Sequence, residues 1–99
     1  MNIVKKILCK DLCPIQKITN ILSDEWTILI IRDLMQKDMR FTELEKSLIG
    51  ISTRTLTIKL NNLLEQNIID KKECIYSITE KGLKLKCVLD KMATVGKDF

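Results

Sequence analysis

Residues 50–64 are GISTRTLTIKLNNLL, and they contain the strongest pattern in the chain. Ser52 is a suitable N-cap for a helix over about residues 53–66. One side of this helix is predicted to be apolar, through Leu56, Leu60, Leu63 and Leu64. No Asp or Glu occurs in the stretch, so the opposite side of the helix is suited to an anionic partner.

The polar side of this helix carries the side-chain types that proteins use to contact DNA. Helix N-terminal amides and hydroxyls bind phosphates, Arg pairs with guanine, Asn pairs with adenine, and an aliphatic side chain can contact a thymine methyl group. The candidate DNA-binding residues here are Ser52, Thr53, Arg54, Thr55, Thr57, Ile58, Lys59, Asn61 and Asn62. The alternative is an ordinary solvated face, because any exposed helix surface is polar.

Helices and one short strand are expected before this stretch. The helix start signals are Pro14, Asp24 and Thr42, the last with Glu45 as its capping-box partner. Gly50 is the natural stop of the third helix. The expected elements are helices over 14–22, 25–36 and 43–49, with a strand over 39–41 between the last two.

The C-terminal third is predicted to be a β-hairpin over 68–78 followed by a helix. Asn67 can take the left-handed conformation that ends the preceding helix, and Thr79 is a suitable cap for the last helix, with Gly82 as a weak position near its start. The expected fold class is mainly α with a small β-hairpin, a winged helix-turn-helix in a single domain over residues 1–99. Its ends are expected to be an N-terminal arm over 1–12 and a C-terminal dimerisation helix over 79–99.

Two further groups of side chains are candidates for DNA contact. Arg40 and Thr42 flank the start of the third helix, where Arg40 is either a phosphate contact or an ordinary surface charge. Lys71 and Lys72 lie on the expected wing, and they can follow the phosphate backbone or enter a minor groove. Lysines also protect edge strands from aggregation, so both interpretations of the wing stay open.

Composition argues against several classes of protein. The chain has 17 Lys and Arg against 13 Asp and Glu, and this net charge of +4 is by itself weak support for nucleic-acid binding. No His, Gly-rich phosphate loop or nucleophile–base pair is present, so we expect no enzyme activity and no catalytic residue. The four cysteines lack paired spacing, so we expect no metal site and no cofactor. Without an apolar run of membrane-spanning length, the chain is expected in the cytoplasm, associated with the nucleoid.

Five short strings follow one another in a fixed order along the chain. They are LCPI at 12–15, EWTILIIRDL at 25–34, RFTEL at 40–44, GISTRTLT at 50–57 and YSITEKG at 76–82. The last four resemble the strings KWT-L-IL-R-L, RF-EL, GIS-RTL and Y-LTEKG of HxlR-type regulators, relatives of the MarR group of winged helix-turn-helix proteins. The resemblance covers about residues 12–95.

This resemblance implies a homodimeric transcription regulator, which we interpret as a repressor, that binds double-stranded DNA at an inverted-repeat operator. In HxlR-type proteins the N-terminal and C-terminal helices form the dimer. The corresponding candidates here are Ile15, Ile18, Leu85, Val88, Leu89, Met92 and Val95. The alternative is that the C-terminal stripe packs on its own domain.

Cys13 is the candidate redox-sensing residue. It lies at the start of the first expected helix, where the helix dipole and nearby lysines favour a thiolate while Asp11 opposes it. Some HxlR-type regulators sense electrophiles or oxidants through a cysteine at the matching place. The alternative is a small buried residue, and we interpret Cys74 and Cys87 as packing residues of that kind.

The chain also departs from the HxlR pattern in two places. The hairpin between Asp70 and Tyr76 is shorter than the usual wing, and Asp24-Glu25 stands where a Gly-Lys pair is typical. Both departures reduce the DNA contact expected from those regions. Two other functions stay open: a winged-helix protein–protein interaction module, and a non-specific architectural DNA binder. Salt dependence and site selection distinguish all three.

Overall fold

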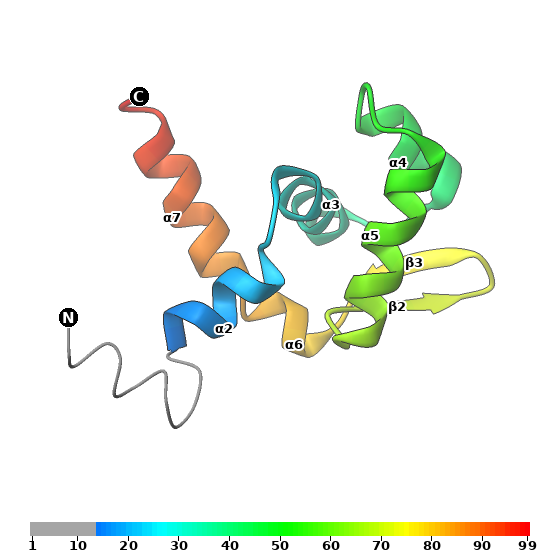
Figure 1. The fold of residues 1–99 in the computed structure, drawn as a ribbon, viewed down its shortest axis with the longest axis horizontal. Helices are drawn as coiled ribbons and strands as arrows, with labels where there is room; N and C mark the ends of the chain where they lie inside the picture. Colours follow the sequence, from blue (N-terminus) through cyan, green and yellow to red (C-terminus); the bar gives the residue numbers. More distant parts are fainter. Residues whose placement is uncertain (1–13) are drawn as a thin grey trace.

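The computed structural model describes residues 14–99, so the expected arm over 1–12 and Cys13 lie outside the described residues. The elements are α2 (Pro14–Ile21), α3 (Glu25–Gln36), β1 (Met39–Arg40), α4 (Phe41–Ser47), α5 (Thr53–Glu65), β2 (Ile69–Lys72), β3 (Ile75–Ile78), α6 (Glu80–Leu83) and α7 (Lys86–Gly96). The structure is mainly helical with a small antiparallel sheet, whose β2–β3 hairpin lies beside α5 at the edge of the molecule, and this confirms the predicted fold class (Figure 1).

Helix α3 is the central helix of the domain, as its apolar sequence predicts. Ile30, Ile31 and Leu34 are each at most 1% exposed. Asp24 caps the helix, and its Oδ1 accepts a hydrogen bond from the backbone N–H of Thr27 at 2.8 Å. The predicted bounds of this helix are therefore confirmed, because the cap signal and the apolar run agree.

The start of α4 differs from the prediction. The helix begins at Phe41 with Arg40 as its N-cap residue, so Thr42 lies inside the first turn. The Glu43 carboxylate takes the capping role, because its Oε1 accepts a hydrogen bond from the backbone N–H of Arg40 at 3.0 Å. The predicted capping box of Thr42 and Glu45 was wrong, and the strand over 39–41 loses its last residue to α4.

Helix α5 agrees with its predicted bounds to within one residue. Ser52 is the N-cap; Leu56, Leu60 and Leu63 lie in the core, and Leu64 packs against it. Gly50 has φ of +93° and Asn67 has φ of +62°, so both residues take the left-handed conformations that separate α5 from its neighbours.

The sheet has the strand order β1–β3–β2, with all strands antiparallel. Tyr76 on the central strand is 6% exposed and pairs with Met39 on one side and Lys71 on the other. Glu73 and Cys74 close the hairpin with φ of +49° and +69°, the conformation of a two-residue type I′ turn. Such a turn points its side chains into solvent, and Cys74 is exposed, so its interpretation as a packing residue was wrong.

The single C-terminal helix of the prediction is in fact two helices, α6 and α7. The N–H of Lys84 bonds to the carbonyl of Lys81 at 3.3 Å, and the N–H of Leu85 bonds to the carbonyl of Gly82 at 3.0 Å. These three-residue spacings tighten the chain relative to a regular α-helix. The turn brings Leu85 into the core, where it is 3% exposed, and burial of this side chain favours the break.

Packing requires a glycine at position 82, where we had expected only a position that weakens the helix. A Cβ atom at this position would lie 2.3 Å from the backbone oxygen of Ile68 and 2.7 Å from Cδ1 of Ile78. Its N–H also donates to Oγ1 of the cap residue Thr79 at 3.0 Å. The missing side chain therefore allows α6 to approach the base of the hairpin.

A buried carboxylate joins α3 to α4. Asp33 is 4% exposed; its Oδ1 accepts a hydrogen bond from Nη2 of Arg32 at 2.9 Å, and its Oδ2 accepts one from Oγ of Ser47 at 2.6 Å. A buried charge needs such partners, so these contacts fix the two helices against each other.

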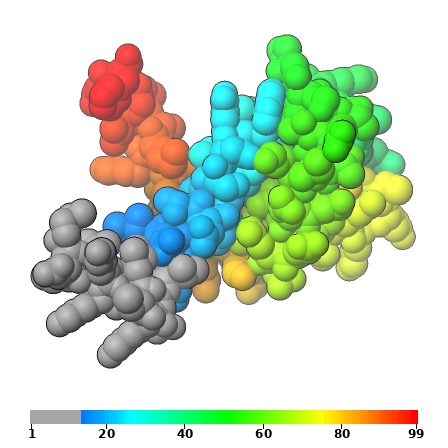
Figure 2. Space-filling model, viewed as in Figure 1, coloured from blue at the N-terminus to red at the C-terminus, as the bar shows by residue number. Residues whose placement is uncertain are grey.

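Helix α7 projects from the rest of the domain (Figures 1 and 2). It contacts α3, yet Met92 and Val95 are 46% and 45% exposed. Cys87 is exposed as well, which corrects its interpretation as a packing residue. None of the helices in residues 14–99 is long and apolar enough to cross a membrane.

Candidate nucleic-acid interface

The outer face of α5 gathers the predicted base-contacting side chains. Arg54, Asn61 and Asn62 are exposed, and Ile58 is 45% exposed. They lie opposite the buried leucines, because successive residues turn by about 100° around a helix. The structure thus brings together an arginine, two amides and an aliphatic side chain on one accessible surface, which we call the α5 outer face.

The hydroxyls at the start of α5 are already used within the chain. Oγ of Ser52 accepts the N–H of Thr55 at 3.0 Å and donates to its Oγ1 at 2.9 Å. Thr53 donates to Oε2 of Glu45 at 2.7 Å, and Thr57 donates to the carbonyl of Thr53 at 2.8 Å. In this arrangement Thr55 accepts a hydroxyl proton, so its own O–H can donate to a phosphate.

Glu45 is a residue of this surface that sequence reasoning assigned to the wrong role. It belongs to α4, yet its carboxylate contacts the first residue of α5. The stretch 50–64 has no acidic residue, but the fold places one at its N-terminal end. Only the tertiary contact between α4 and α5 reveals this, because the sequence spacing predicts a cap at a different position.

Lys59 is the predicted DNA contact whose environment differs most from the expectation. Its Nζ forms an ion pair with Oδ2 of Asp24, and the side chains are 23% and 34% exposed, respectively. Partial burial raises the pKa of Asp24, but hydrogen bonds from Lys59 and Thr27 outweigh it and hold the pKa below the ordinary value of 3.8. The carboxylate therefore stays charged and paired at neutral pH.

The start of α4 and the wing flank the α5 outer face. Arg40 and Thr42 are exposed, so both are accessible to a partner. Lys71 and Lys72 are also exposed, and Nζ of Lys71 lies 5.3 Å from the centroid of the Tyr76 ring. This contact directs one wing lysine back over the sheet. Lys72 is exposed, and it directly precedes the acidic turn residue Glu73.

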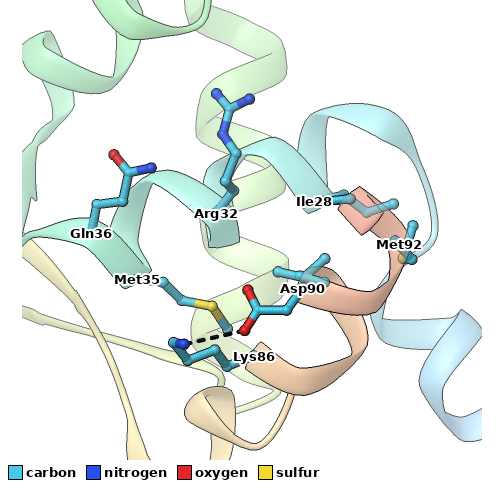
Figure 3. Close-up of a pocket in the computed structure, with 9 residues that line it drawn as sticks. Ile28, Arg32, Met35, Gln36, Lys86, Asp90 and Met92 are labelled. Carbon is cyan, nitrogen blue, oxygen red and sulfur yellow. Dashed lines mark hydrogen bonds and ion pairs between the residues drawn. The ribbon is translucent and has the colours of Figure 1, made fainter. Parts of the chain in front are cut away.

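A groove separates α3 from α7 on another part of the molecule (Figure 3). It has a volume of about 410 Å³, and Met35 extends from α3 towards α7 while Arg32 and Gln36 lie at its rim. On the α7 side, Nζ of Lys86 lies 3.2 Å from Oδ2 of Asp90. The groove is mainly apolar, and it is continuous with the exposed side of α7.

The candidate dimer residues fall into two environments. Leu85 is in the core of its own domain, and Ile18 and Leu89 pack against that core, so these three have a structural role within one chain. Ile15 is 76% exposed, and Met92 and Val95 are about half exposed, while Val88 is intermediate. The exposed group lies on α2 and α7. Within residues 14–99 there is no cluster of potential metal ligands.

A helix-turn-helix of α4 and α5 with a hairpin wing defines the class of winged helix-turn-helix proteins. The chain belongs to the HxlR-like helix-turn-helix family, whose model matches residues 21–99. The HTH-type transcriptional regulator sll1512 of Synechocystis is 34% identical over 95 residues, which is 89% of this chain and 70% of the relative. The chain is therefore an HTH-type transcriptional regulator, as the resemblance of its sequence strings implied.

Solved structures of similar proteins agree with this assignment. Quinone-bound YodB from Bacillus subtilis has a TM-score of 0.81 and 32% identity, covering 88% of this chain and 100% of that one. YodB has also been solved in reduced form and after diamide treatment. A MarR-family regulator from Porphyromonas gingivalis has a TM-score of 0.83 and 30% identity, covering 89% of this chain and 93% of its own.

Proposed function

We propose that the protein is a homodimeric repressor that places α5 in the major groove of a specific double-stranded DNA site. The observation that carries this proposal is the α5 outer face, which is accessible and holds an arginine and two amides, while the nearby carboxylate of Glu45 is paired with Thr53 at its N-terminal end. A major groove admits one α-helix and displays a distinct donor and acceptor pattern for each base pair. Binding to chromosomal DNA would associate the protein with the nucleoid.

Within this proposal the α5 side chains have different roles. Arg54 is near the N-terminal end of the helix, where recognition helices contact base edges, and its guanidinium can pair with O6 and N7 of guanine. Asn61 and Asn62 lie further along the helix and can pair with adenine. Arg40, Thr42, Thr55 and the wing lysines surround this face and are suited to phosphates, which position the protein without selecting sequence.

The second copy in the proposed dimer covers the exposed side of α7. Leu85 and Leu89 face their own domain, so Val88, Met92 and Val95 form an additional apolar strip that one chain leaves accessible. This strip continues into the α3–α7 groove, whose apolar lining also lacks a cover within the described chain. A two-fold dimer through these surfaces pairs two α5 helices and predicts an inverted repeat with half-sites about 10 base pairs apart.

Selection from genomic DNA tests this function. The purified, reduced protein is incubated with fragmented DNA from its source, and the bound fragments are sequenced. Enrichment of a short inverted repeat is the expected result. The variant Arg54→Gln should lose this enrichment, whereas Lys97→Gln, which removes the same charge from the end of α7, should retain it. Uniform recovery would indicate an architectural binder, and no recovery at moderate salt would indicate a protein-binding module.

We also propose that Cys13 makes DNA binding responsive to electrophiles or oxidants. The support is its place in the sequence directly before α2 and the similarity to YodB, which has been solved in quinone-bound form. Cys74 and Cys87 are exposed thiols and therefore serve as controls. With a quinone, wild type, Cys74→Ser and Cys87→Ser should release the enriched DNA, and Cys13→Ser should retain it. Equal release by Cys13→Ser would contradict this role.

A further inference from the structure

Asp24 uses its two carboxylate oxygens on two different helices. Oδ1 caps α3 by accepting the N–H of Thr27, and Oδ2 forms the ion pair with Nζ of Lys59 on α5. Capping explains why a side chain with a hydrogen-bond acceptor stands at this position, and Asn, Ser and Asp are all good N-caps. It does not require the contact with Lys59, because a neutral cap would satisfy the same backbone donor.

Lys59 would otherwise add a cation to the edge of the α5 outer face. It directly follows Ile58 in the sequence, and its ammonium group lies on a flexible four-carbon stem that can reach several directions. The ion pair directs this group towards the N-terminus of α3 instead. Glu25 follows Asp24 and is exposed, so the N-terminus of α3 carries two adjacent acidic residues.

We propose that Asp24 restrains DNA binding by holding the ammonium group of Lys59 against α3 and away from the phosphate backbone. This inference rests on the proposed function, because it concerns the strength of the same DNA complex. To contact a phosphate, Lys59 must first leave a partly buried partner that is also charged, so the gain from the phosphate is offset by the loss of the pair. Lys59 therefore contributes little to DNA affinity in the wild type.

Five variants measured on one DNA probe test the restraint. The probe is a mixed-sequence duplex of about 30 base pairs, long enough for two half-sites. Asp24→Asn keeps a capping oxygen and removes the charge, and Asp24→Ser is a second variant of the same kind. Glu25→Gln makes the same change in net charge at the neighbouring exposed residue. Lys59→Gln is made alone and also together with Asp24→Asn.

The readout is the slope of log affinity against log salt concentration, which changes by about 0.9 for each phosphate neutralised. Asp24→Asn and Asp24→Ser should bind more tightly at low salt, with a slope steeper by about 1.8, because each dimer frees two copies of Lys59. Glu25→Gln should leave the slope unchanged. Lys59→Gln should have no effect on the wild type and should return the slope of Asp24→Asn to the wild-type value.

Two results would overturn the restraint. One is an unchanged slope in both folded Asp24 variants, and the other is a shallower slope for Lys59→Gln in the wild-type background, which would show that Lys59 already contacts DNA. The proposed function fails differently, because then the wild type itself binds no duplex at any salt concentration. Circular dichroism and thermal melting establish that each variant is folded.

Discussion

The recognition half of the molecule is formed by α4, α5 and the β2–β3 hairpin. It differs from the C-terminal half around α7 in how many of its side chains have contacts within the same chain. In the recognition half, hydroxyls, caps and even Lys59 have partners within the same chain. On α7, Met92 and Val95 stay about half exposed beside an apolar groove. The difference teaches that the surface proposed to face DNA is organised within a single chain, whereas the α7 surface is one half of the proposed dimer interface.

The largest expected effect concerns α7. Met92→Asp places a charge in both copies of the proposed interface, and two such losses of about 2 kcal/mol each should weaken the dimer by about 4 kcal/mol, or roughly 1,000-fold. Sedimentation equilibrium measures the dissociation constant. Thr94→Asp is the matched control, because it adds the same charge to another side of the same helix. If both variants dimerise like the wild type, α7 is not the interface.

The next largest effect tests the junction between the two halves. Gly82→Ala should destabilise the fold by about 3 kcal/mol, because the added Cβ meets the rigid backbone oxygen of Ile68. Gly96→Ala has nothing within 4 Å and should be neutral or slightly stabilising. Chemical denaturation compares the free energies of unfolding. Equal values for the two variants would show that α6 can move away from the hairpin without a penalty.

A smaller effect tests the organisation of the recognition half. Ser52→Ala removes the N-cap of α5 and should destabilise the protein by about 1 kcal/mol. Thr42→Ala should change stability by less than about 0.5 kcal/mol, because this threonine is exposed and does not cap α4. Thermal denaturation distinguishes the two. A larger loss for Thr42→Ala would restore the capping role that the sequence suggested.

The smallest effect is the pH dependence from Asp24. Its pKa is below 3.8 in the folded protein, so the pair stabilises the fold above the unfolded-state pKa, and this contribution is lost as pH falls through the lowered folded-state pKa. Solvent screening limits it to about 1 kcal/mol. The difference in unfolding free energy between wild type and Asp24→Asn should be constant near neutral pH and shrink in acid. A difference that grows on acidification would contradict the ion pair.

The sequence predicted elements well where two local signals agree. The bounds of α3 were correct and those of α5 agreed to within one residue, because a cap residue and an apolar stripe both mark these helices. The start of α4 was wrong because Thr42 and Glu43 are both plausible cap partners, and spacing alone does not show which oxygen reaches the free N–H. The break before α7 was missed because it depends on burial of Leu85, which is a tertiary effect.

The sequence predicted which side chains the α5 outer face presents better than it predicted the contacts that those side chains make. Arg54, Ile58 and the two asparagines share a face because helical periodicity alone determines it. The partners of Lys59 and Thr53 come from other elements, 35 and 8 residues away in the sequence, so no local pattern predicts them. The dimer candidates include both exposed and buried side chains, since an apolar stripe does not reveal which of its two sides faces its own domain.

The tight turn at Lys84 and Leu85 also has a geometrical consequence. Gly82 is wedged against the hairpin base and Leu85 is buried, so the direction in which α7 leaves the domain is fixed within a few residues of the wing. In a two-fold dimer through α7, the angle between α7 and the rest of the domain determines how far apart the two α5 helices lie. Operator spacing would then be encoded in residues 82–85, independently of the base preference encoded in α5. Two regulators with identical recognition helices but different residues at these positions would then bind operators whose half-sites are spaced differently.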